Sequence, residues 1–169
     1  MRRTSFSDMP CSIARTLEVV GDWWTLLIVR EAFFGRRRFG EFEKALGIAP
    51  NVLAQRLGKL VEGGILTVSA ESQNGRALAY RLSPKGRDLF PILVAMVQWG
   101  DAHGDWPEGP PVRIVERRTG REIAPLVMRN QEGQALAVHE VAAVAGPGAS
   151  EATREHLAGG NAPAGKPQA

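Results

Sequence analysis

The fold is decided by residues 40–62, which read GEFEKALGIAPNVLAQRLGKLVE. Gly40 is a tolerable N-cap for a short helix over 41–46, whose apolar side chains face inward. The turn 47–49 separates this helix from a longer one that begins with Pro50, a residue suited to the first helical position, and ends before two glycines. A short helix, a tight turn and a longer helix form the helix-turn-helix pattern.

The flanking segments extend this pattern to a winged helix. Hydrophobic periodicity, caps and turn residues predict helices over 11–20, 23–34 and 83–100, and a hairpin of strands over 66–69 and 78–82. Asp22 is placed to cap the second helix, and an Asn-Gly pair lies in the hairpin loop. The order predicts a mainly α-helical domain with a small β-hairpin wing over residues 1–103.

The chain changes character after this domain. Three short apolar runs, 112–115, 123–128 and 135–138, are separated by turn residues and predict a small antiparallel β meander within an extension over 104–145. Gly, Pro, Ala and Ser dominate residues 146–169, which predicts a disordered tail with at most a turn of helix around 151–157.

Charge and composition exclude several classes of protein. The 169 residues carry a net charge of +3, but the first hundred have 14 basic and 9 acidic residues, and the remainder is slightly acidic. No apolar run is long enough to span a membrane and no signal peptide begins the chain, so we expect a cytoplasmic protein without a membrane partner. One cysteine and three scattered histidines make no zinc set, and no catalytic arrangement of residues is present. We therefore expect neither an enzyme nor a bound metal or cofactor.

The longer helix of the pattern separates an apolar face from a polar one. Leu53, Leu57 and Leu60 lie on one face, whereas Asn51 and Gln55 lie on the other, with Lys59 beside them. In a helix-turn-helix the free face of the second helix enters the major groove of DNA, where an amide side chain can pair with adenine. We predict base contacts from Asn51 and Gln55; an ordinary solvated helix face is the alternative.

Basic side chains near this helix are candidates for phosphate contacts, because positive charge positions a protein on DNA without reading its sequence. The candidates are Arg36, Arg37, Lys59 and Arg76 of the wing. For Arg38, next to Phe39, and for Arg56, on the flank of the apolar face, a structural hydrogen bond or ion pair fits equally well.

Many spaced residues also match the pattern of one family. The matching positions are Cys11, 13–15, Gly21, Asp22, 24–28, Arg38, Phe39, Phe42, Ile48, Leu53, 55–57, Leu60, Gly64, Tyr80, Leu82, Lys85 and Gly86. Over residues 9–101 the chain resembles the HxlR-type winged helix-turn-helix regulators, which are related to the MarR group. The resemblance implies a cytoplasmic bacterial regulator, usually a repressor, that binds a palindromic operator in double-stranded DNA as a homodimer through its N-terminal segment and final helix.

Two departures from the family pattern affect the recognition helix, 50–62. Ala49 stands where the family commonly has a Ser or Thr N-cap, a loss of about 1 kcal/mol in helix stability. Gly58 stands where a basic residue is common, so it removes a phosphate contact and loosens the helix. We expect a lower operator affinity than is usual for the family.

Two features are candidates for effector sensing. Cys11 matches the cysteine with which some family members sense oxidants or electrophiles, and it lies near a helix start where the helix dipole lowers thiol pKa values; a small residue at a helix start is the alternative. The aromatic side chains are candidates for lining a pocket for an apolar effector, with core and dimer packing as the alternative. They are Trp23, Trp24, Phe33, Phe34 and Trp99.

The extension is similar, less specifically, to a zinc-ribbon-like extension of some actinobacterial family members. In this resemblance Thr119, Met128 and Gln131 stand at its cysteine positions, which implies a degenerate ribbon that has lost its metal. Its small apolar core predicts docking on the winged helix or on the partner subunit. Taken together, the residues favour a sequence-specific transcription regulator; the alternative is a winged-helix adaptor that binds protein and not DNA.

Overall fold

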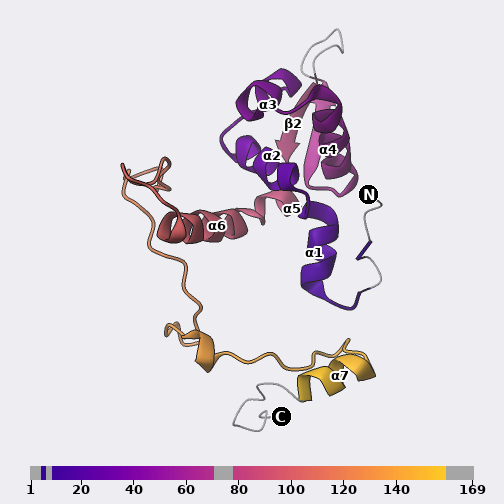
Figure 1. Ribbon diagram of the computed structural model, residues 1–169, viewed down its shortest axis with the longest axis vertical. Helices are drawn as coiled ribbons and strands as arrows, with labels where there is room; N and C mark the ends of the chain where they lie inside the picture. Colours follow the sequence, from indigo (N-terminus) through magenta and orange to yellow (C-terminus); the bar gives the residue numbers. More distant parts are fainter. Residues whose placement is uncertain (1–4, 7–8, 71–77, 159–169) are drawn as a thin grey trace.

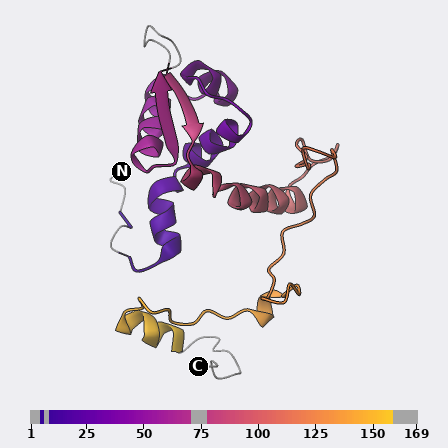
Figure 2. The ribbon, with the colours of Figure 1, turned by 180° about the vertical axis from the view of Figure 1, so that it is seen from behind.

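The computed structural model describes residues 5–6, 9–70 and 78–158, and its elements follow the predicted order of a winged helix (Figures 1 and 2). The helices are α1 (Ser12–Val20), α2 (Trp23–Phe33), α3 (Phe39–Leu46), α4 (Pro50–Glu62), α5 (Pro84–Arg87), α6 (Phe90–His103) and α7 (Glu151–Ala158). The strands are β1 (Leu66–Ala70) and β2 (Leu78–Leu82), and a 3-10 helix, η1 (Val138–Glu140), precedes α7.

The core forms around α2, whose Ile28 and Val29 are wholly buried. The apolar faces of α3 and α4 pack on α2, β2 also contacts α2, and β1 contacts α4, so the helix-turn-helix is supported by α2. The predicted cap of α2 is confirmed, because Asp22 Oδ1 accepts a hydrogen bond from the backbone N–H of Trp24 at 3.1 Å.

The wing is a two-stranded antiparallel hairpin in which Leu66 pairs with Leu82 and Ala70 with Leu78. The segment before α3 joins its edge: Arg38 forms an antiparallel bridge with Ala79, and the N–H of Tyr80 donates to the carbonyl of Arg37 at 2.8 Å. This pairing fixes the basic segment 36–38 against the wing.

Two predicted helix boundaries were wrong. The third helix begins at Phe39 with Arg38 as N-cap, and not after Gly40. The Glu41 carboxylate, at the third helical position, reaches back to accept the backbone N–H groups of Arg37 and Arg38, and this stabilises a start at Phe39. The last helix is two helices, α5 and α6, since Pro91 has no N–H to continue the hydrogen-bond ladder through this point.

Residues 104–158, called the arm below, extend away from the winged helix. The predicted meander is reduced to isolated antiparallel bridges, Val115 with Glu122 and Arg129 with Ala135, and the third apolar run leads into η1. Runs this short, with no second layer to cover them, do not build a sheet. The expected turn of helix near the end is present as α7.

The predicted docking of the extension on the winged helix is confirmed for its first part. The side chain of Gln98 on α6 accepts from the N–H of Leu126 at 2.8 Å and donates to the carbonyl of Ala124 at 3.4 Å, and the indole of Trp106 donates to the carbonyl of Gly100. From there the arm passes in an open arc below α6 and α1, as both ribbon views show. Within the described residues, no helix combines the length and apolar character that crossing a membrane requires.

Candidate nucleic-acid interface

The two faces of α4 are separated as the sequence predicts. Leu53, Leu57 and Leu60 are buried in the core. Asn51 and Gln55 are exposed on the opposite face and belong to the first half of the helix, the part that reaches base edges in a helix-turn-helix. Each of these amide side chains carries both a hydrogen-bond donor and an acceptor.

The start of α4 has the weak cap that the sequence predicts. Ala49 has an extended backbone conformation and makes no side-chain hydrogen bond to the first turn, while Pro50 stands at the first helical position. At Gly58, a methyl group added to the backbone would meet no atom within 4 Å, so no packing contact requires a glycine in the middle of this helix.

The Arg56 side chain is bonded to two other residues of the protein. Its Nη2 lies 2.6 Å from Asp22 Oδ2, its Nη1 donates to Gln55 Oε1 at 3.1 Å, and only 17% of its side chain is exposed. Arg56 therefore joins α4 to the cap of α2 and holds the Gln55 amide by its oxygen. Of the two readings of this arginine, the structure supports the structural one.

Lys59 is exposed on the last turns of α4, but two carboxylates share its surroundings. It borders a shallow hollow together with Glu18 of α1 and Glu62 of its own helix. Lys59 stays an exposed candidate for a phosphate contact on α4.

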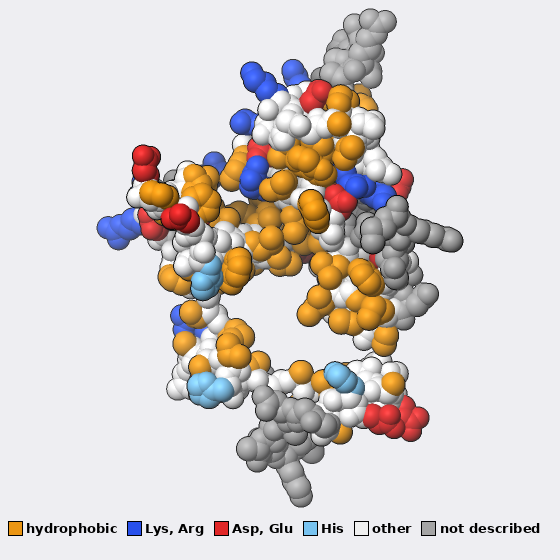
Figure 3. Space-filling view, viewed as in Figure 1, with side chains coloured by type: hydrophobic (Ala, Val, Ile, Leu, Met, Phe, Trp, Pro, Cys, Tyr) orange, Lys and Arg blue, Asp and Glu red, His pale blue; other side chains and the backbone are white. Residues whose placement is uncertain are grey.

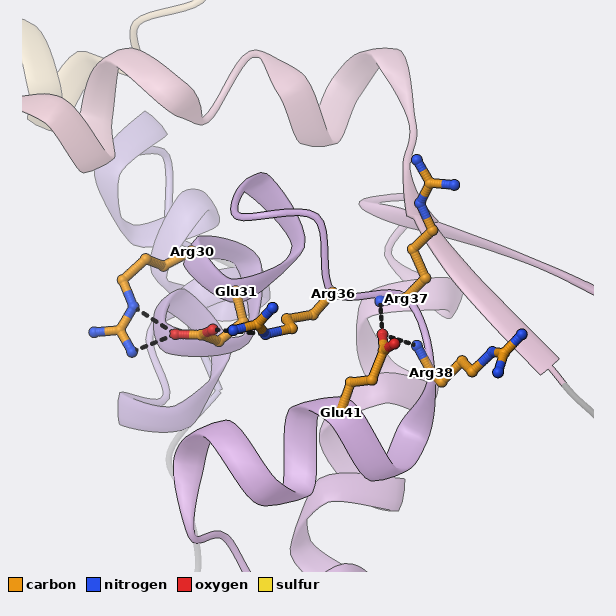
Figure 4. A network of polar contacts seen from close by, with 6 residues as sticks. All are labelled: Arg30, Glu31, Arg36, Arg37, Arg38 and Glu41. Carbon is orange, nitrogen blue, oxygen red and sulfur yellow. Dashed lines mark hydrogen bonds and ion pairs between the residues drawn. The ribbon is translucent and has the colours of Figure 1, made fainter. Parts of the chain in front are cut away.

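The three arginines of the segment 36–38 differ in their surroundings (Figure 4). Arg36 lies 3.8 Å from Glu31, a buried carboxylate that also pairs with Arg30 at 2.6 Å. The side chains of Arg37 and Arg38 extend away from Glu41 in Figure 4. The backbone N–H groups of these two arginines donate to Glu41 Oε2 at 2.7 and 3.0 Å and lower the pKa of its carboxyl. Glu41 therefore orders the backbone that carries them and leaves their guanidinium groups outside its hydrogen bonds.

One predicted contact, Arg76 of the wing loop, lies outside the described residues. A further cation, Lys44 on α3, was missed: it is exposed and borders a surface hollow with Arg36 and Glu41. Because α3 is the helix that crosses the DNA backbone in this motif, the helical spacing of Lys44 from the buried Phe42 would have identified it.

The five aromatic residues predicted to line an effector pocket do not come together. Trp23 is 90% exposed and Trp99 is 69% exposed, whereas Trp24 packs against the core. Phe33 and Phe34 do line a cavity of about 450 Å³ between α2, α6 and the arm. Its wall is mostly apolar; Phe90 packs on Phe33 with 4.8 Å between ring centroids, and Val112 and Ile114 of the arm close one side. Patterns within single sequence segments did not predict that residues of α6 and the arm line this cavity as well.

Cys11 is an exposed, free thiol at the N-cap position of α1, with no side-chain hydrogen bond to the helix. Arg2 and Arg3, the basic residues nearest to it in sequence, lie outside the described residues. Across the part of the chain that the structure describes, no three His, Cys, Asp or Glu side chains are grouped closely enough to hold a metal ion.

A helix-turn-helix with an exposed polar recognition face, a hairpin wing and basic residues beside both defines a winged-helix DNA-binding protein. The sequence pattern of the HxlR-like helix-turn-helix family matches residues 19–107. The chain belongs to this family, whose members are transcriptional regulators, and it is an HTH-type transcriptional regulator.

Similar proteins extend the likeness beyond the winged helix. HTH-type transcriptional regulators of Mycobacterium tuberculosis and Mycobacterium bovis are 42% identical over 137 residues, which cover 81% of this chain and 87% of theirs. The crystal structure of the candidate transcription factor PA1607 is 45% identical, with a TM-score of 0.77, and covers 83% of this chain and 98% of its own. The redox regulator HypR in its reduced form is 30% identical with a TM-score of 0.51, and covers 56% of this chain. The match with PA1607 is therefore longer than the winged helix, whereas the match with HypR is not.

Proposed function

We propose that this regulator is a homodimeric, cytoplasmic repressor that binds a palindromic operator in double-stranded DNA with α4 in the major groove. Asn51 and Gln55 read base edges, and Arg37, Arg38 and Arg36 contact phosphates together with Lys59, Lys44 and the wing's Arg76. The observation that carries the proposal is the exposed amide face of α4 opposite a buried leucine face, in a chain whose basic segment 36–38 is tied to the wing at β2. Residues 1–103 form the DNA-binding and dimerisation unit in this proposal, 104–145 the extension and 146–169 the tail.

Fluorescence anisotropy with DNA from the protein's own upstream region tests this proposal at two salt concentrations. Asn51→Ala and Gln55→Ala should each lower operator affinity about tenfold or more while changing affinity for random DNA little, because a good bidentate base contact is worth about 1–3 kcal/mol. Arg37→Ala should weaken both kinds of binding and reduce the salt slope by about one.

Arg117→Ala is the matched control, since this exposed arginine lies on the arm and away from α4. Its affinity and salt slope should equal those of the wild type. Absence of any DNA binding at low salt would refute the proposal in favour of the protein-interaction adaptor.

The homodimer is supported by apolar side chains that remain exposed on two helices. Ile13 and Leu17 on α1 are 71% and 43% exposed, and Met96 and Trp99 on α6 are 51% and 69% exposed. Large apolar patches of this kind on a folded chain mark contact surfaces. Sedimentation equilibrium should give a dimer at micromolar concentration, and a monomer there would contradict the assignment.

Two routes of release are compatible with repression. The first is an apolar ligand in the cavity behind Phe33 and Phe34, which is large enough for a small aromatic molecule. Phe33→Trp should fill the cavity and abolish the effect of such a ligand on operator binding, while Trp23→Phe, at an exposed position outside the cavity, should leave that effect unchanged.

The second route is oxidation of Cys11, which is exposed and therefore accessible to oxidants. HypR, to which the chain is similar, is a redox regulator with solved reduced and oxidised forms. Cys11→Ser should keep operator binding and lose any response to diamide or a quinone. Equal responses of the two proteins would exclude Cys11 as the sensor.

A further inference from the structure

The arm carries apolar side chains without a core of its own. Val138 is 82% exposed and Val144 63%, and Leu126, Val127 and Met128 are each about half exposed. Only the first part of the arm is anchored on α6, through Trp106 and Gln98. A chain segment that stays extended while exposing this much apolar surface lacks the burial that would offset its loss of conformational entropy.

In the space-filling view, α1, α6 and the arm border a wide opening, and hydrophobic side chains are visible on its upper and right-hand borders (Figure 3). The exposed hydrophobic residues of these two helices include Ile13 and Leu17 of α1 and Met96 and Trp99 of α6. The unpartnered faces of α1 and α6 and the arm thus border one space.

The exposed area measures how much surface lacks a partner. An ordinary folded monomer of 18.3 kDa exposes about 8100 Å², whereas this chain exposes 13254 Å². If the residues that the structure does not describe are given the full exposed area of an unfolded chain, the rest of the chain still exposes roughly 2000 Å² more than an ordinary folded chain of its mass. Two chains that each buried this excess would bury roughly 4000 Å² in all, the size of an obligate homodimer interface.

We propose that each arm encloses the second copy of this chain, so that α1 of one protomer lies in the opening formed by α1, α6 and the arm of the other. This inference rests on the homodimer of the proposed function and names the surface that stabilises it. A second copy fits better than an unrelated partner. In a two-fold dimer each chain offers both an arm and exposed apolar faces on α1 and α6, so each arm covers an apolar face of the other chain.

A solved structure also contains part of this segment. The overlay with PA1607 covers 83% of this chain, which is more than residues 1–103 alone, so the match extends into residues beyond the winged helix.

The test uses the full-length chain with Val138→Asp and, separately, Val144→Asp. Each substitution places two charges in the dimer, one per arm, where an apolar contact is expected. Loss of two buried valine contacts should raise the dimer dissociation constant about 100-fold or more in sedimentation equilibrium. Gln131→Asp adds the same charge at an exposed polar turn of the arm and should change the constant less than about threefold. Far-UV circular dichroism checks that the winged helix remains folded in every variant.

The outcomes separate this inference from the proposed function. A wild-type dimer that both valine variants weaken, with Gln131→Asp unchanged, supports the enclosing arm. A wild-type dimer that neither valine variant weakens overturns the enclosing arm and leaves the homodimeric repressor intact. A wild-type monomer at micromolar concentration overturns both, and an arm that then binds another macromolecule has a different occupant.

Discussion

Replacing Asp22 with asparagine tests whether Arg56 stabilises the fold or contacts DNA. Asp22 has two roles: one carboxylate oxygen caps α2, and the other lies 2.6 Å from the Arg56 guanidinium. Asparagine caps a helix as well as aspartate does, so Asp22→Asn removes the ion pair and keeps the cap. Asp22→Ala removes both.

The magnitude follows from the partial burial of the pair. The two side chains are 17% and 25% exposed, which places the pair between a buried ion pair, whose breakage costs about 3–5 kcal/mol, and a surface pair worth about 0–1 kcal/mol. We expect Asp22→Asn to cost about 2 kcal/mol of unfolding free energy. Asp22→Ala should cost about 3 kcal/mol, since loss of the cap adds about 1 kcal/mol.

Urea unfolding at fixed protein concentration measures these differences, because dimerisation makes apparent stability depend on concentration. Asp105→Asn is the control, an exposed aspartate of the arm that should change stability by less than about 0.5 kcal/mol. The reasoning is refuted if Asp22→Asn is as stable as the wild type. It is refuted equally if Arg56→Met keeps full stability and lowers the salt slope of DNA binding by about one, since Arg56 would then be a phosphate contact.

Three further changes address the recognition helix and its approach. Gly58→Ala should raise stability by about 1 kcal/mol in urea unfolding, because the site has free space and a helical glycine is disfavoured; a loss of stability would mean that the glycine is structurally required. Ala49→Ser should add about 0.5–1 kcal/mol by supplying the missing N-cap, and no gain would show that water caps the first turn equally well. Hydrogen bonds from the N–H groups of Arg37 and Arg38 lower the pKa of Glu41 from its ordinary 4.5, so the stability that they contribute is present above that pH and is lost as the pH falls through the folded-state pKa. Glu41→Gln should therefore flatten the decline in melting temperature below about pH 4.5, and parallel declines in both proteins would contradict this linkage.

The sequence predicted those parts of the site that depend on local geometry. A helical period of 3.6 residues is enough to place Leu53 and Leu57 in the core and Asn51 and Gln55 outside, whatever the rest of the chain does. The cap at Asp22 is equally local, since its acceptor and the N–H that it binds lie two residues apart. For the same reason the winged helix could be predicted from single segments read in order.

The role of Arg56 could not be predicted, because its partner lies on another helix. Sequence spacing left a phosphate contact and an ion pair equally open, and only the packing of α4 on α2 brings Asp22 within 2.6 Å. The N-cap of α3 was missed for a related reason. Arg38 caps poorly by residue type, and the start at Phe39 is stabilised instead by the Glu41 carboxylate, which reaches back to the backbone N–H groups of Arg37 and Arg38.

The cavity and the arm share residues, so the two proposals about them are coupled. Val112 and Ile114 belong to the arm and form part of the wall that faces Phe33 and Phe90. A ligand in this cavity would contact α2, α6 and the arm together. In the proposed dimer, the positions of these same elements set the distance between the two recognition helices. Ligand binding and operator binding would then affect each other, because the ligand would bind two geometries of the dimer with different affinities. A ligand that bound both geometries equally well would leave DNA binding unchanged, however tightly it bound.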